Sequence, residues 1–264
     1  MTDILFGENY MGRIVVIANQ KGGVGKTTTT INLGAGLTFY NKKILLVDFD
    51  PQGNCSSGVG LDTKNTILTI YNVLFGTDIN KAIIKTKINN FYIIPANINL
   101  TGATVELVDN PNREYYLKNA LEKVRNNFDF ILIDCPPSLG ILTLNGLVAA
   151  DSVLIPIQTE FFALEGLTQL IHTINLVKKK YNTKLFIEGV LLTMLDKRTH
   201  LTEDVIKNVI GYFGKKVYDT MVPRNVRLAE APSYGVPIFL HDNECVGAKA
   251  YKELAMEFIN GKGK

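Results

Sequence analysis

Cysteine and histidine are scarce in this chain of 264 residues, and their scarcity removes several classes of site. The three cysteines, Cys55, Cys135 and Cys245, lie far apart and form no C-x-x-C pair. That spacing matches no zinc or iron–sulfur motif, and we expect no disulfide. The histidines are equally scattered and show no metal-ligand spacing, at His172, His200 and His241.

The chain also lacks a long apolar run. No stretch approaches the roughly 18 residues that are needed to cross a bilayer. The first ten residues contain Asp3 and Glu8, and they have neither the basic start nor the apolar stretch of a secretory signal. We therefore expect a cytoplasmic protein that does not enter a membrane. The net charge of +3 permits contact with nucleic acid but does not imply it.

Repeats, low-complexity segments and a Pro/Gly-rich linker are absent too, and the length suits one large α/β domain. Short apolar runs alternate with longer amphipathic segments, and most runs are nearly continuous, as in parallel strands that are covered on both faces. This alternation predicts a doubly wound α/β fold with a mostly parallel sheet and helices on both faces. The predicted strands are Ile14–Ile17, Ile44–Val47, Phe91–Ile94, Phe130–Ile133, Val153–Ile157, Val190–Leu192 and Val217–Val222.

Helical patterns lie between these runs. Five residues share one helix face at spacings of three and four, and they predict core packing: Leu164, Leu167, Ile171, Ile174 and Val177. Two further helices are predicted over Arg113–Arg125 and Gly247–Ile259.

A glycine-rich stretch joins the first strand to a helical pattern. It does not fully match the usual phosphate loop G-x-x-x-x-G-K-[ST], because Gln20 stands where the first glycine belongs. Gly22, Gly23 and Gly25 nevertheless allow a tight turn that brings backbone N–H groups close to phosphate oxygens. A strand, a loop and a helix follow one another as such a site requires. We therefore favour a phosphate site over a glycine turn without a ligand.

The end of this loop supplies the polar groups of a nucleotide site. The ammonium of Lys26 can neutralise the β- and γ-phosphates, and the hydroxyl of Thr27 can bind Mg²⁺. The helix that begins there adds the positive end of its dipole, next to Thr28. The cofactors predicted from these residues are ATP and Mg²⁺.

Acidic residues end two of the predicted strands. Asp134 closes an apolar strand in the manner of a Walker B element and would hold Mg²⁺, through a water molecule. Asp48 could support the shell of the metal, and Asp50 could orient the attacking water. A structural role, such as capping a helix, is the alternative for Asp134 and Asp48, because a buried acid must find partners.

Together these residues resemble the deviant Walker A ATPases, and within them the ParA/Soj family of DNA-partition proteins. That family has the loop K-G-G-x-G-K-T, which Lys21–Thr27 matches without a break and which accounts for Gln20. Asp48–Asn54 resembles its second motif, Asp134–Ser138 its Walker B and switch region, and Val222–Pro232 its late motif. The resemblance spans almost the whole chain from Met11.

The resemblance implies an ATP hydrolase in which ATP joins two subunits face to face. Lys21 of one subunit would reach the phosphates that the other subunit binds, as an arginine finger does in trans. Read without the family, Lys21 is only a cation beside a phosphate loop. Asp50 would be the switch residue for hydrolysis. The phosphate loop, including Val24, would hold the nucleotide, and Pro223 and Asn225 would lie near the adenine.

The resemblance also implies non-specific DNA binding, through Arg198 and Arg227, and a ParB-like DNA-binding partner that stimulates hydrolysis. Contact with phosphates needs such cations and no base-reading motif. Taken alone, both arginines could be solvated surface residues. For the run Lys178–Lys180, at the end of a predicted helix, we prefer an interaction with the helix dipole to DNA contact. The protein would then work in the cytoplasm on the nucleoid.

Two other functions remain open. A MinD-type positioning ATPase carries a basic amphipathic helix at its end, but the tail after Asn260 has no apolar face to insert into a membrane. A cluster carrier of the nitrogenase-reductase type needs suitably spaced cysteines, and Cys135 has no evident partner. The expected organisation is an N-terminal extension over 1–10, an ATPase domain over 11–260 and a short polar tail over 261–264. Met11 could be an alternative initiator.

Overall fold

A seven-stranded sheet runs through the part of the chain that the computed structural model describes, residues 11–160, 163–196 and 200–261. The strand order is β3-β4-β2-β5-β1-β6-β7. Six strands are parallel, and the short β3 pairs antiparallel with β4 at one edge. Their bounds are β1 (Arg13–Ile17), β2 (Ile44–Asp48), β3 (Ile84–Lys85), β4 (Phe91–Ile94), β5 (Phe130–Asp134), β6 (Ser152–Gln158) and β7 (Phe186–Thr193).

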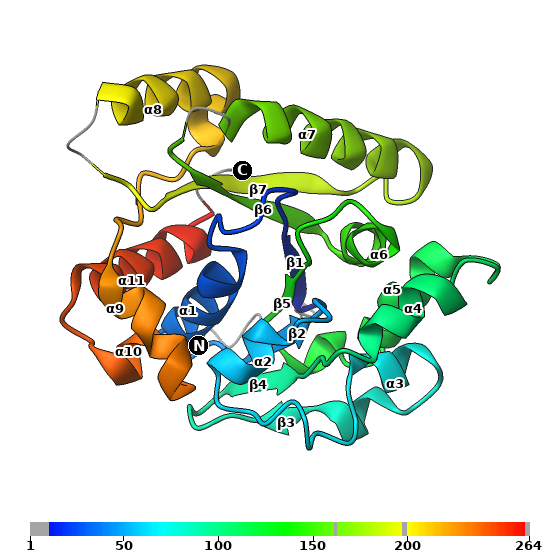
Figure 1. The fold of residues 1–264 in the computed structure, drawn as a ribbon. Helices are drawn as coiled ribbons and strands as arrows, with labels where there is room; N and C mark the ends of the chain where they lie inside the picture. Colours follow the sequence, from blue (N-terminus) through cyan, green and yellow to red (C-terminus); the bar gives the residue numbers. More distant parts are fainter. Residues whose placement is uncertain (1–10, 161–162, 197–199, 262–264) are drawn as a thin grey trace, which may run out of the picture.

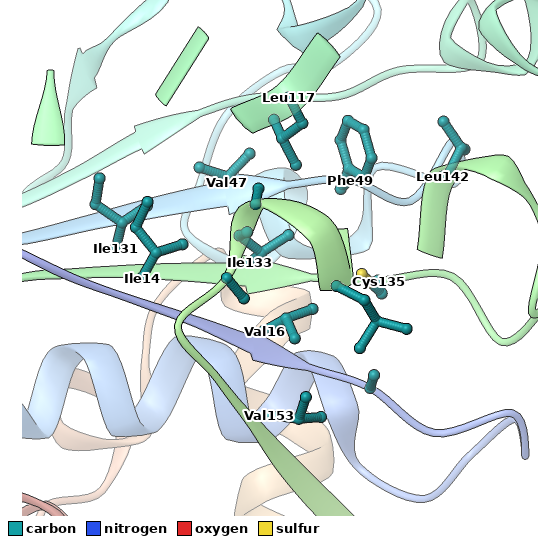
Figure 2. Packing of buried hydrophobic residues seen from close by; sticks show 14 of the residues in the cluster. Ile14, Val16, Val47, Phe49, Leu117, Ile131, Ile133, Cys135, Leu142 and Val153 are labelled. Carbon is teal, nitrogen blue, oxygen red and sulfur yellow. The ribbon is translucent and has the colours of Figure 1, made fainter. Parts of the chain in front are cut away.

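Both faces of the sheet are buried, which explains the continuous apolar runs. In β1, Ile14 and Val16 belong to one apolar core, whereas Val15 and Ile17 belong to the other. Figure 2 shows part of the first core, in which residues of β1, β2 and β5 meet Leu117 of α5 and Leu142 of α6.

Helices cover each face of the sheet (Figure 1). The core that contains Val15 packs against α1 (Lys26–Thr38), α2 (Asn54–Gly58), α9 (Val226–Glu230), α10 (Ile238–His241) and α11 (Val246–Ile259). The core that contains Ile14 packs against α3 (Ile70–Leu74), α4 (Leu100–Glu106), α5 (Tyr116–Leu121), α6 (Ile141–Ala149), α7 (Ala163–Lys180) and α8 (His200–Phe213). Short 3-10 helices are η1 (Ile79–Ala82), η2 (Arg113–Tyr115), η3 (Arg125–Asn127), η4 (Gly214–Lys216) and η5 (Ala231–Tyr234). The predicted doubly wound fold is confirmed.

Some predicted elements were wrong. The segment Val217–Val222 is not a strand, and only its first residue forms a bridge, to Val190. Its N–H groups at Tyr218 and Val222 bond to Val190 O and Leu192 O of β7, both at 2.9 Å, but those at Asp219 and Thr220 bind the carboxylate of Glu257, at 2.7 and 3.0 Å. The single helix predicted over Arg113–Arg125 is broken into η2, α5 and the start of η3.

The carboxyl ends of the central strands lie at one edge of the sheet. β1 pairs with β5, and β5 pairs with β2, with Asp48 directly opposite Asp134. The loop that follows β1 therefore faces both acids before it enters α1. Within the described residues, no helix has the length and apolarity that crossing a bilayer requires.

Candidate functional site

The loop between β1 and α1 has a backbone shape that demands glycine. Gly23 has φ +74° and Gly25 has φ +86°, both in the left-handed region that other L-residues adopt at a cost. A Cβ at Gly23 would meet no atom within 4 Å, so the glycine is required by the backbone and not by packing. Gly25 is the N-cap of α1 and offers no side chain to the first N–H groups of the helix. Those donors are available to an anion.

Lys26 lies under this loop. Its side chain is buried, and its Nζ donates a hydrogen bond to the carbonyl oxygen of Lys21 at 3.0 Å. Burial lowers the pKa of Lys26, while the nearby carboxyl of Asp134 opposes that shift. The loop thus holds a cation that is only partly compensated, and a phosphate group would complete its coordination.

Asp134 and Thr27 form the second part of the site. The Thr27 hydroxyl donates to Asp134 Oδ2 at 2.7 Å, and Thr30 Oγ1 lies 3.2 Å from Asp134 Oδ1. Burial raises the pKa of Asp134 to about 8, and the neighbouring Asp48 adds to that shift. A hydroxyl and a carboxylate this close are oxygen ligands of the kind that Mg²⁺ prefers, with water and phosphate completing its shell. The residues present therefore fit a magnesium ion beside a nucleotide.

The carboxylate of Asp48 accepts hydrogen bonds from the residues that follow β2. Its Oδ2 accepts from the backbone N–H of Ser56 at 2.8 Å and from the Ser56 hydroxyl at 2.6 Å, and its Oδ1 accepts from Asp50 N at 3.2 Å. Burial raises the pKa of Asp48 to about 6, although these hydrogen bonds oppose the shift. Asp48 thereby fixes the loop that carries Asp50. It lies beside Asp134 but has partners of its own, which favours the structural alternative over direct contact with a metal.

Asp50 faces a cavity of about 430 Å³. Its Oδ1 accepts from Gln52 N at 3.0 Å, and the side chain is almost buried. The cavity brings together residues of the phosphate loop, the Asp50 loop and the segment after α9: Gly22, Gly23, Gly25, Lys26, Thr27, Thr28, Asp50, Asn54 and Pro232, among others. A carboxylate there can orient a water molecule near the terminal phosphate of a nucleotide.

Lys21 does not fold back onto its own loop. Its Nζ lies 2.6 Å from Glu160 Oε2, and both side chains are more than a third exposed. Glu160 was not predicted, because 139 residues separate it from Lys21 and only the fold brings the two together.

Two unpredicted residues anchor the loop to the sheet. Asn19, at its start, donates to Pro156 O at 2.7 Å and accepts from Lys21 N at 3.0 Å. Thr193, at the end of β7, donates to the carbonyl oxygen of Val24 at 2.9 Å. The side chain of Val24 itself is buried, so Val24 holds the loop in place with both its side chain and its carbonyl.

A second cavity, of about 210 Å³, adjoins the first through Gly25 and Thr28. Pro223 and Asn225, which the family resemblance implies lie near the adenine, line this cavity, and so does Met194, which the sequence did not indicate. That they contact an adenine stays a prediction. Met194 has φ +52°, an uncommon conformation that brings its side chain beside both cavities. The Asn225 side-chain oxygen caps α9, accepting from Leu228 N at 3.2 Å.

Of the two arginines that were predicted to contact DNA, the structure describes only Arg227. Arg227 lies on α9 with its side chain 55% exposed, and it forms ion pairs with Glu230 and Asp242. Arg198 lies outside the described residues. The run Lys178–Lys180 forms the last turn of α7, where the lysines suit the helix dipole.

The cysteines support no metal cluster in the described part of the chain. Cys55 and Cys135 are buried and Cys245 is half-buried, and all three are free thiols. Nor are three His, Cys, Asp or Glu side chains grouped to hold a metal among the described residues. A magnesium ion that draws most of its ligands from water and phosphate is compatible with that finding.

Comparison with known proteins places these features in context. Residues 12–187 match the family model described as an AAA domain. The chromosome-partitioning ATPase Soj of Treponema pallidum is 56% identical over 255 residues, which cover 96% of this chain and all of that protein.

Two solved structures extend the comparison. The cobyrinic acid a,c-diamide synthase of Mycobacterium smegmatis, with bound ADP and magnesium, is 38% identical, with a TM-score of 0.83 and 95% of each chain covered. The cell division ATPase MinD of Pyrococcus furiosus is 27% identical, with a TM-score of 0.76 over 95% of this chain and 99% of that one.

Proposed function

The chain belongs to the ParA/Soj family of chromosome-partitioning ATPases, and from that premise we propose that it hydrolyses ATP and partitions DNA as an ATP-dependent dimer. The observation that carries the proposal is the convergence of Lys26, Thr27, Asp50 and Asp134 at the carboxyl edge of the sheet, around one cavity or directly beside it. The cargo is a chromosome or a plasmid.

In this proposal the phosphate loop binds ATP. The free N–H groups at the start of α1 and the ammonium of Lys26 neutralise the phosphates. Thr27, and Asp134 through a water molecule, would hold Mg²⁺, which would offset the charge of the phosphate oxygens. Asp50 orients the attacking water, while Asp48 fixes the loop of Asp50 through Ser56. The adenine occupies the cavity of Pro223, Asn225 and Met194.

Dimerisation completes the site. Lys21 is held by Glu160 and does not reach toward the phosphates of its own loop, so its ammonium can serve a second subunit. We propose that Lys21 leaves Glu160 when two ATP-bound subunits meet and that it then contacts the partner's nucleotide. An exposed ion pair is worth only about 0–1 kcal/mol, so the exchange is inexpensive compared with a contact to a phosphate.

DNA binding follows from the dimer. Two subunits present two copies of Arg227 and Arg198, and affinity for DNA rises with the number of phosphates that are contacted. The complex would lie on the nucleoid in the cytoplasm, and a ParB-like DNA-binding protein would stimulate hydrolysis.

The alternative is a membrane-associated positioning ATPase of the MinD type, which the similarity to the Pyrococcus furiosus protein supports. A membrane helix needs an apolar face that is free to insert. In α11 the apolar residues Tyr251, Leu254, Ala255 and Phe258 are buried against the core that contains α1. The described end of the chain therefore favours partition over membrane binding.

The test is a DNA-shift titration with Mg·ATP, with Mg·ADP and without nucleotide, at low and at moderate salt. We expect binding without sequence preference only with ATP, and a steep loss of affinity with salt. Liposome sedimentation with anionic vesicles is run in parallel. Equal DNA binding in all three states would contradict an ATP-gated dimer. ATP-dependent sedimentation without DNA binding would favour the MinD-type alternative.

A further inference from the structure

Two carboxylates, of Glu230 and Asp242, lie beside the guanidinium of Arg227. Its Nη1 lies 2.9 Å from Glu230 Oε2, and its Nε lies 3.5 Å from Asp242 Oδ2. The same Glu230 oxygen lies 3.4 Å from His241 Nε2, and the His241 ring packs against Tyr234. One arginine thus faces two carboxylates. With a neutral His241, the net charge of Arg227, Glu230 and Asp242 together is −1.

Other contacts hold both carboxylates in place. Asp242 Oδ1 accepts from the backbone N–H groups of Glu244 and Cys245, at 3.2 and 3.1 Å, and so caps the turn before α11. Glu230 lies one turn after Arg227 on α9 and also pairs with His241 of α10. Arg227 and then His241 lower the pKa of Glu230, so Glu230 stays ionised at neutral pH. Both acids therefore have hydrogen-bond partners besides Arg227.

A phosphate must compete for this arginine. The guanidinium has five N–H donors in a fixed plane, and two of its three nitrogens already face carboxylates. A DNA phosphate that approaches Arg227 would share those donors with Glu230 or displace it, and it would also meet the negative charge of both acids.

We propose that Glu230 and Asp242 compete with DNA phosphates for Arg227 and thereby set the strength of DNA binding. The inference rests on the proposed DNA-binding function. It adds that Glu230 and Asp242 limit the affinity for DNA. Because exposed ion pairs contribute little, the competition weakens DNA binding by a modest factor and does not abolish it.

The test compares Glu230→Gln and Asp242→Asn with the matched control Glu253→Gln. Each variant removes one negative charge, and the exposed Glu253 of α11 forms no ion pair within the described part of the chain. DNA affinity is measured with Mg·ATP at several salt concentrations. We expect Glu230→Gln and Asp242→Asn each to tighten binding about two- to fivefold more than Glu253→Gln.

The gain must depend on Arg227. When Arg227→Ala is already present, Glu230→Gln should improve binding no more than Glu253→Gln does. An equal gain without Arg227, or no gain beyond that of Glu253→Gln, would overturn the inference. So would a lowered thermal midpoint of Glu230→Gln without any gain in affinity, because the cluster would then only stabilise the fold. Asp242→Asn is the riskier variant since it touches a turn, and Glu230→Gln alone decides the question if Asp242→Asn does not fold.

The inference and the function can fail separately. If the parent protein binds DNA with ATP and Glu230→Gln matches Glu253→Gln, the inference alone is wrong. If neither the parent nor any variant binds DNA in any nucleotide state, the proposed DNA-binding function fails and the inference fails with it.

Discussion

Replacing Asp134 by asparagine should stabilise the nucleotide-free protein increasingly as the pH rises. Burial raises the pKa of Asp134 from 3.8 to about 8, so the folded protein keeps a proton that the unfolded chain releases. This contribution to stability is fully present below pH 3.8 and is lost as the pH rises toward the folded pKa of about 8. Asparagine does not ionise, so the free energy of unfolding of the variant does not fall with pH for this reason.

The magnitude follows from proton linkage. One proton that is bound only in the folded state changes the free energy of unfolding by about 1.4 kcal/mol per pH unit. Between pH 5 and pH 7 the parent should therefore lose about 3 kcal/mol relative to Asp134→Asn. Asp48, whose pKa is raised to about 6, titrates in both proteins and largely cancels in the difference.

Urea unfolding at pH 5, 6, 7 and 8, with EDTA and no nucleotide, measures this difference directly. The control is Asp62→Asn, since hydrogen bonds from Asn65 and Lys64 lower the pKa of Asp62. Asp62 is ionised in both states above pH 5, and the effect of its replacement should stay constant there. A stability difference for Asp134→Asn that does not change with pH, or that falls as the pH rises, would refute the assignment of a buried, proton-binding carboxyl.

Three further variants test other parts of the structure. Lys26→Ala should abolish ATP binding in a fluorescent-nucleotide titration because it removes the cation under the loop, and parental affinity would refute the phosphate-site assignment. Ser56→Ala should destabilise the protein by about 1–3 kcal/mol in urea, since the buried Asp48 loses a donor at 2.6 Å; an unchanged midpoint would contradict that. Glu188→Gln should cost roughly 3–5 kcal/mol because Arg13, 3.2 Å away, would lose its buried countercharge, and a loss below about 1 kcal/mol would show that the pair is dispensable.

Strands that are buried on both faces were the most predictable part of the fold. Phe130–Asp134 is apolar throughout and ends in an acid, and it lies at the centre of the sheet, between β1 and β2. Val217–Val222 is less uniform, because Asp219 and Thr220 lie at its centre, and their backbone N–H groups bind Glu257 instead of a neighbouring strand. An apolar composition predicts that a segment is buried, but it does not predict which acceptor each backbone N–H group will bind. The two-residue β3 is too short for any periodicity to reveal.

The candidate site likewise contains residues that a local sequence pattern predicts and residues that only tertiary packing brings to it. Lys26, Thr27 and Thr28 follow one another in the sequence, so local geometry alone brings them together at the start of α1. Glu160 and Thr193 reach the loop only through tertiary packing, across 139 and 169 residues, and no local pattern points to them. The apolar strands that end in acids indicated Asp48, Asp50 and Asp134, but neither that pattern nor the resemblance to a family could indicate that Asp48 binds Ser56 or that Arg227 is paired with carboxylates.

Sedimentation velocity of Asp50→Ala tests the central claim most directly, namely that ATP bound at the Lys21–Thr28 loop joins two subunits. The variant should bind ATP without hydrolysing it, so it should sediment as a dimer with Mg·ATP and as a monomer without nucleotide. Adding Lys26→Ala should restore the monomer by preventing ATP binding, and adding Lys21→Ala should weaken the dimer without loss of ATP binding. A monomer at saturating ATP, or a dimer that persists when Lys26 is replaced, would contradict the account.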